Sequence, residues 1–169
     1  MEQSEKEKKE RARKGEAILA ELRKLAEGKV GQRVVFHCFE AGIRYNEQAG
    51  QAKGACKSLN NYFVGVELYY NGSFAGAVAM AHEVGHLYTM SPEDDRAYHC
   101  NWKTVFGYER LASRWALAFL AERLNKKELA LAERSLNIWL DSYYEAYNIN
   151  DEARQFVHAG ERVREEVEA

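Results

Sequence analysis

The stretch that decides the fold is "AVAMAHEVGHLYTM", residues 77–90. Small and apolar residues dominate it, and two histidines, His82 and His86, lie four positions apart within it. Side chains four positions apart on an α-helix project from the same face, so a helix would hold both imidazoles together. Ser73 can cap such a helix at its start, and Pro92 would stop it after residue 90. We therefore predict a helix that presents two histidines to one point.

Glu83 follows the first histidine and completes the pattern H-E-x-x-H, which is typical of zinc peptidases. Both imidazoles could reach one zinc ion at about 2.0–2.1 Å. Glu83 lies about 100° around the helix from His82, so it is better placed to contact a metal-bound water than the metal. We predict His82 and His86 as zinc ligands and Glu83 as the base that deprotonates that water. Gly85 has no side chain, so another element can pack closely there. The plainer alternative is an ordinary helix that carries two histidines.

A catalytic zinc site has three protein ligands and one open position, so a third ligand is required. The candidates are Glu109, His99, Cys100 and the acidic cluster Glu93, Asp94 and Asp95. We favour Glu109 because it opens the stretch "ERLASRWALAFLAERL", whose apolar residues recur at helical spacing. A second helix packed against the first would bring a glutamate at its start towards the histidine pair.

Hydrolysis at such a site also needs a donor for the negative charge that develops on the substrate oxygen. Tyr98, His99 and Tyr108 lie between the two ligand segments and are candidates for this role or for a supporting contact. The chain has 10 tyrosines, so half-buried packing is the plainer role for either tyrosine.

The rest of the chain predicts one domain over residues 1–169, with residues 1–14 as a solvated, charged N-terminal extension. The fold class we predict is α+β, mostly helical, with a small β-sheet beside the H-E-x-x-H helix. We expect a helix first, then short strands with a loop between them, and then helices, with a polar connection after the H-E-x-x-H helix. The ranges are a helix from Ile18 to near Gly28, strands at 33–39 and 61–71, a loop with a possible strand at 40–60, a connection at 91–106, and helices from 109, over 128–147 and over 151–167.

Composition narrows the class of protein further. The 169 residues suffice for an ordinary core, and 46% are hydrophobic and 30% charged. A net charge of −2 argues against a nucleic-acid partner. The 3 cysteines are odd in number and have no C-x-x-C spacing, which fits reduced thiols. With no signal peptide and no run of about 20 apolar residues, we expect a cytoplasmic protein that binds neither membranes nor nucleic acid.

The segments "YYN…AMAHEVGHLYTM" and "ERLASRWALAFL" together resemble the ImmA/IrrE-type metallopeptidases over roughly residues 60–120. The resemblance implies a zincin fold and a Zn²⁺ ion on His82, His86 and Glu109, with Glu83 as the catalytic base. Ser113 departs from the small polar or asparagine character that the family shows after the alanine, and the Leu-Leu-x-Pro ending of that helix is missing. The same helix also resembles the E-x-L-x-A segment of ArdC-type antirestriction zincins.

The main functional hypothesis is a zinc metallopeptidase that hydrolyses a peptide bond in a protein substrate. The resemblance suggests a repressor or regulator of a phage or mobile element as that substrate. The alternative is a non-catalytic zincin-fold protein that binds a partner protein in an anti-defence or regulatory role. A helical DNA-associated regulator is a third hypothesis, which no basic face supports. Glu83 separates the first two, because only the peptidase needs its carboxylate.

Overall fold

The computed structural model describes residues 4–30, 34–39, 51–55, 65–71, 73–90 and 102–161, with the strands described by their backbone. Its elements, in chain order, are α1 (Glu5–Val30), β1 (Val34–Phe39), β2 (Gln51–Ala55), β3 (Gly65–Asn71), α2 (Phe74–Thr89), α4 (Trp102–Ala121), α5 (Lys126–Ala146) and the 3₁₀ helix η2 (Asp151–Ala153). In this part of the chain, no helix combines the length and the apolar character needed to cross a membrane.

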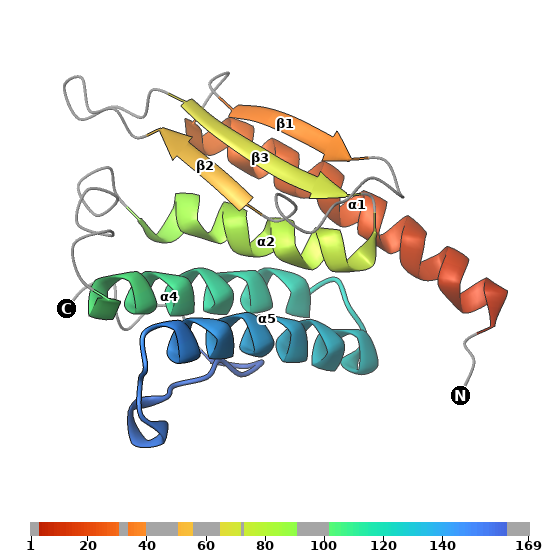
Figure 1. Ribbon diagram of the computed structural model, residues 1–169. Coiled ribbons are helices and arrows are strands. Elements are labelled where there is room, and N and C mark those ends of the chain that lie inside the picture. The colour runs from red at the N-terminus through yellow and green to blue at the C-terminus, as the bar shows by residue number, and fades with distance from the viewer. Residues whose placement is uncertain are drawn as a thin grey trace.

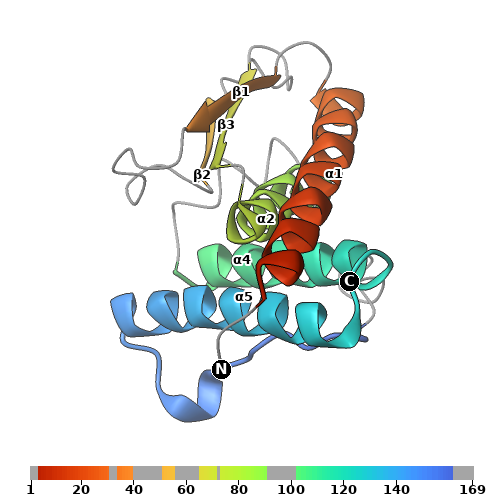
Figure 2. The ribbon, with the colours of Figure 1, turned by 90° about the vertical axis from the view of Figure 1, so that its right-hand side faces the viewer.

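Helix α2 lies at the centre of the molecule and contacts α1, α4, α5, β2 and β3. In Figure 1 the sheet lies on one side of α2, and α4 and then α5 lie on the other. Figure 2, turned by 90°, shows α1 running beside α2 and the sheet. A helix with neighbours on all sides must be apolar nearly all round. Accordingly, its buried residues are Gly76, Ala77, Val78, Met80, Ala81, His82, Val84, Gly85 and Leu87.

Both ends of α2 follow the prediction from the sequence. Ser73 is the N-cap residue, and its Oγ accepts a hydrogen bond from the Gly76 N–H at 3.0 Å. At the other end the Met90 N–H donates to the His86 carbonyl oxygen at 3.0 Å. These bonds satisfy backbone groups that a helix end otherwise leaves without an intrahelical partner. The helix that carries the H-E-x-x-H pattern is therefore confirmed.

The three strands form one sheet in the order β1-β3-β2. Strand β1 runs parallel to β3, with Val34 opposite Val66, and β2 runs antiparallel to β3, with Gln51 opposite Tyr69. The strands β1 and β3 fall within the predicted ranges 33–39 and 61–71, and β2 falls in the range predicted as a loop with a possible strand.

The α+β class predicted from the sequence is nevertheless wrong for the body whose side chains are described. Of those residues 81% are helical and none lies in a strand. The described core comes from the four helices and the segments that follow α4 and α5. Alternation of apolar and polar residues predicts that a strand forms. The class of the fold is decided by which elements pack together into the core. Here α2 buries its apolar surface against three other helices.

Helix boundaries differ from the prediction at two places near the N-terminus and the candidate site. Helix α1 runs continuously from Glu5, so it begins 13 residues before the predicted start at Ile18. The Lys14 Nζ lies 2.9 Å from the Glu128 Oε1, which joins this part of α1 to α5. Helix α4 begins at Trp102, seven residues before Glu109, and so takes in the end of the predicted polar connection. Glu109 therefore lies inside a formed helix.

The predicted helix over 151–167 is wrong for residues 154–161, and residues 162–169 lie outside the described part. Only Asp151–Ala153 is helical, as a 3₁₀ turn. Beyond it, side chains of α5 take the backbone hydrogen bonds that a helix would have used. The Asn137 amide accepts from the Val157 N–H at 2.9 Å and donates to the Val157 carbonyl at 2.8 Å. The Tyr144 hydroxyl bonds both backbone groups of Gln155.

Candidate metal centre

Helices α2 and α4 approach each other backbone to backbone at Gly85. A Cβ atom built at Gly85 would lie 2.6 Å from the Ala112 carbonyl oxygen and 3.1 Å from the Ala112 Cα. Such distances leave no room for a side chain at this position, in agreement with the close packing predicted at Gly85. Side chains on either side of this contact can therefore reach across the short gap between the two helices.

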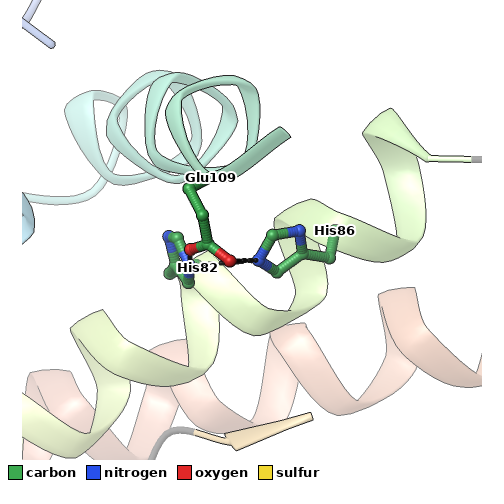
Figure 3. Close-up of side chains that lie close together, drawn as sticks. All are labelled: His82, His86 and Glu109. Carbon is green, nitrogen blue, oxygen red and sulfur yellow. Dashed lines mark hydrogen bonds and ion pairs between the residues drawn. The ribbon is translucent and has the colours of Figure 1, made fainter. Parts of the chain in front are cut away.

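Three of those side chains meet at one point (Figure 3). The His82 Nε2 lies 2.9 Å from the Glu109 Oε2, and the His86 Nε2 lies 3.5 Å from the Glu109 Oε1. The two Nε2 atoms are 3.1 Å apart. The side chains come from α2 and α4 and point toward one another, and one ligand atom of each lies within 4.8 Å of the others.

The cluster is shielded from water, and its carboxyl group is ionised. His82 is 7% exposed and Glu109 3%. Burial by itself would raise the pKa of Glu109, but the charge of His86 and hydrogen bonds from both histidines outweigh it and hold the pKa well below its usual value. Glu109 is therefore a carboxylate at neutral pH, the form in which it can bind a cation.

The donor geometry fits a tetrahedral metal ion. Ligand bonds of about 2.0–2.2 Å at a tetrahedral centre separate neighbouring ligand atoms by about 3.3–3.6 Å. The distances from Glu109 are 2.9 Å (Oε2 to His82 Nε2) and 3.5 Å (Oε1 to His86 Nε2), and the two Nε2 atoms are 3.1 Å apart, so the separations lie within about 0.4 Å of that range. Two imidazoles and a carboxylate are also a ligand set that divalent transition metals accept. This buried group could therefore hold a metal ion.

Two further residues surround His82. The Ser113 Oγ lies 3.0 Å from the His82 Nδ1, and the Trp139 ring meets the His82 ring edge-on at a centroid distance of 6.3 Å. In the sequence, Ser113 stands out only as a departure from a family pattern, and the motifs predict no role for it in the site. The sequence feature that could have indicated a role for Ser113 is its position four residues after Glu109, which places both on the same face of one helix. No sequence feature indicates that Trp139 lies beside His82, because Trp139 belongs to α5, which is far from His82 in the sequence.

The remaining predicted site residues divide into two groups. Glu83 is half-buried on α2, and Tyr108 is half-buried on α4, about 100° around that helix from Glu109. Tyr98 and the alternative ligands of the 91–101 segment lie outside the described residues; these are His99, Cys100, Glu93, Asp94 and Asp95. The roles of all these residues therefore stay predictions.

Comparisons of the chain with models of protein families, with curated proteins and with solved structures gave no match. The resemblance to ImmA/IrrE-type metallopeptidases thus stays a prediction that depends on the two motifs. What the geometry adds is independent of that resemblance: a buried cluster of His82, His86 and Glu109 that could hold a metal ion.

Proposed function

We propose that this protein is a zinc-dependent peptidase that hydrolyses a peptide bond in a protein substrate. One observation carries the proposal: the two histidines of H-E-x-x-H converge with a buried carboxylate from a second helix. A pair of histidines four positions apart on a helix, with a glutamate directly after the first, is the arrangement that zinc metallopeptidases use.

Zinc is the metal that we propose for the cluster. Two histidines and one glutamate form a three-ligand set found in catalytic zinc sites, which keep a fourth position open. Non-haem iron also accepts two histidines and a carboxylate. Zinc is favoured by Glu83, because a carboxylate beside the ligand pair suits proton transfer in hydrolysis. When bound, zinc would polarise the scissile carbonyl and make a water molecule more acidic.

The residues of the chain then have distinct roles. Glu83 lies one position after His82 on α2, offset by about 100°, so its carboxylate can face the space beside the cluster. There it takes a proton from the attacking water and passes it to the leaving amine. The ionised Glu109 balances positive charge at the cluster, and its low pKa keeps it in this form. Tyr98, His99 and Tyr108 remain the candidates for stabilising the substrate oxyanion.

An extended segment of a protein is the substrate that suits this arrangement. Strands β1 and β2 form the edges of the sheet, and β2 contacts the helix that carries the histidines. Extended peptides add to such edges through main-chain hydrogen bonds. We propose that β2 aligns the substrate beside α2. A repressor or other regulator is the class of protein that the motif resemblance favours.

Glu83→Gln tests the proposed chemistry. Zinc-loaded wild type and Glu83→Gln would be incubated with a peptide library made from a digested proteome, and new chain ends would be identified by mass spectrometry. We expect cleavage by wild type, its loss in Glu83→Gln, and equal zinc content in both. Glu145→Gln, at an exposed position on α5, is the matched control and should cleave like wild type.

Two results would count against the peptidase. Equal cleavage by wild type and Glu83→Gln would remove Glu83 from the reaction. Zinc binding without cleavage of any peptide by wild type would favour instead the non-catalytic protein that binds a partner.

A further inference from the structure

Helix α4 contacts both ring nitrogens of His82. The Glu109 carboxylate lies 2.9 Å from Nε2, and the Ser113 hydroxyl lies 3.0 Å from Nδ1. Glu109 and Ser113 are four residues apart, so they project from one face of α4 and lie on either side of the imidazole. All three residues are buried, with Ser113 only 1% exposed. The serine is thus part of the packing around the cluster, and bulk water has little access to its hydroxyl.

We propose that Ser113 is a positioning residue for the metal centre: its Oγ accepts the Nδ1–H of His82 and so directs the Nε2 lone pair at the metal. This inference rests on the proposed metal site and deepens it. A neutral imidazole carries one proton, which lies on either Nδ1 or Nε2. Only the form with its proton on Nδ1 can bind a metal through Nε2.

The chemistry of serine fits this role. A hydroxyl oxygen has two lone pairs, so it can accept the Nδ1–H of His82. Metal-binding histidines usually donate their second ring N–H to an oxygen, and this bond fixes both the tautomer and the orientation of the ring. Because water has little access to Ser113, solvent cannot readily replace the bond if the hydroxyl is removed. The Nδ1–H would then be buried without an acceptor.

The position of Ser113 on a rigid element strengthens the inference. Ser113 follows Ala112, the residue whose backbone meets Gly85 of α2. The same close contact that brings Glu109 to the histidines therefore also sets the distance from Ser113 to His82. Sites whose supporting groups lie on packed helices hold their geometry better than sites on loops.

Ser113→Ala tests the inference through metal affinity, without reference to activity. Zinc dissociation constants would be measured by competition with a chromophoric chelator. We expect Ser113→Ala to bind zinc about 10–100-fold more weakly than wild type, which is the usual effect of removing such a partner. Ser113→Thr keeps the hydroxyl and should restore most of the affinity. Ser135→Ala is the matched control, since the Ser135 Oγ donates to the Leu131 carbonyl within α5.

The proton on His82 Nδ1 gives a second readout that a merely structural serine would not change. In zinc-loaded wild type, ¹H–¹⁵N spectra should show a downfield, slowly exchanging Nδ1–H signal for His82. That signal should move upfield in Ser113→Ala and remain in Ser135→Ala. Weaker zinc binding with an unchanged Nδ1–H signal would overturn the inference, because the serine would then act through packing alone.

The outcomes also separate this inference from the proposed function. Equal zinc affinities in wild type and Ser113→Ala would refute the positioning role and leave the metal site intact. Failure of wild type to bind zinc would refute the metal site itself.

Discussion

The contact between Gly85 and Ala112 yields the sharpest structural prediction, because it links the packing of α2 and α4 to the metal centre. In Gly85→Ala the new Cβ would lie 2.6 Å from the Ala112 carbonyl oxygen. A comfortable contact needs about 3.4 Å, so the two helices must move apart by about 0.8 Å at this point. Metal sites tolerate deviations of only about 0.2 Å in their ligand distances.

The variant should therefore lose metal affinity out of proportion to stability. Overpacking costs about 1–3 kcal/mol, and the better helix propensity of alanine offsets about 1 kcal/mol of that. The net loss of up to about 2 kcal/mol corresponds to a fall in Tm of at most about 8 °C. Zinc affinity should fall by about 100-fold or more, because the carboxylate of Glu109 moves away from the histidines.

The assay combines thermal melts of the zinc-free protein with zinc titration by chelator competition. Gly107→Ala, on α4, is the matched control, since a Cβ there would meet nothing within 4 Å. It should raise the stability by up to about 1 kcal/mol and leave zinc affinity unchanged. If Gly85→Ala bound zinc as tightly as wild type, the close helix contact would not be what assembles the site.

Three further predictions concern metal binding, the C-terminal segment and pH. Zinc at a free concentration of 100 times its dissociation constant should stabilise the folded protein by about 2.7 kcal/mol in thermal melts, and a chelator should reverse this; an unchanged Tm would contradict it. Asn137→Ala should cost about 1–3 kcal/mol in urea unfolding, because both backbone groups of Val157 lose their partner; a cost near zero would show that water replaces these bonds. Burial raises the pKa of Glu128, but hydrogen bonds from Lys14 and the Asn125 backbone outweigh this and lower it overall. The stability that Glu128 contributes should therefore be complete above its unfolded pKa of about 4.3 and disappear as the pH falls through the lower folded value; a Glu128→Gln variant whose stability deficit is the same at every pH would refute this.

The sequence predicted the helix of the histidines well because several local signals agree there. Ser73 supplies the cap, the apolar residues persist all round the helix, and the structure places its end at Thr89, with Met90 as the C-cap. Caps and apolar periodicity act within a few residues, so one sequence is enough to detect them. Gly85 was informative in the same way, since only close packing needs a glycine within a helix of this kind.

The sequence was enough to predict that Glu109 approaches the histidines. It was not enough to predict the distances between these side chains. The apolar face of α4 predicts that the helix packs against another element. It does not predict which residues of the two elements come into contact. The register depends on the Gly85–Ala112 contact, which joins residues far apart in the sequence. The early start of α4 at Trp102 was missed because Thr104 and Gly107, which have low helix propensity, stand between Trp102 and Glu109.

The C-terminal segment and the fold class show where local patterns mislead. Residues 154–161 have a composition that suits a helix, yet their backbone is bonded by Asn137 and Tyr144 of α5. Tertiary hydrogen bonds of this kind override helix propensity and leave no local signal. The same holds for the class of the fold, because the share of the core that each element fills depends on packing across the whole chain.

The metal content of three proteins tests the central claim most directly. Zinc per chain would be measured by mass spectrometry on wild type, His82→Ala and Glu109→Ala after reconstitution and removal of free metal. We predict about one zinc ion per chain in wild type and none retained in either variant, because a buried three-ligand site cannot lose a ligand without losing most of its affinity. Wild type without zinc would contradict the metal centre. Zinc retained in Glu109→Ala but lost in His82→Ala would show that another residue, and not Glu109, is the third ligand.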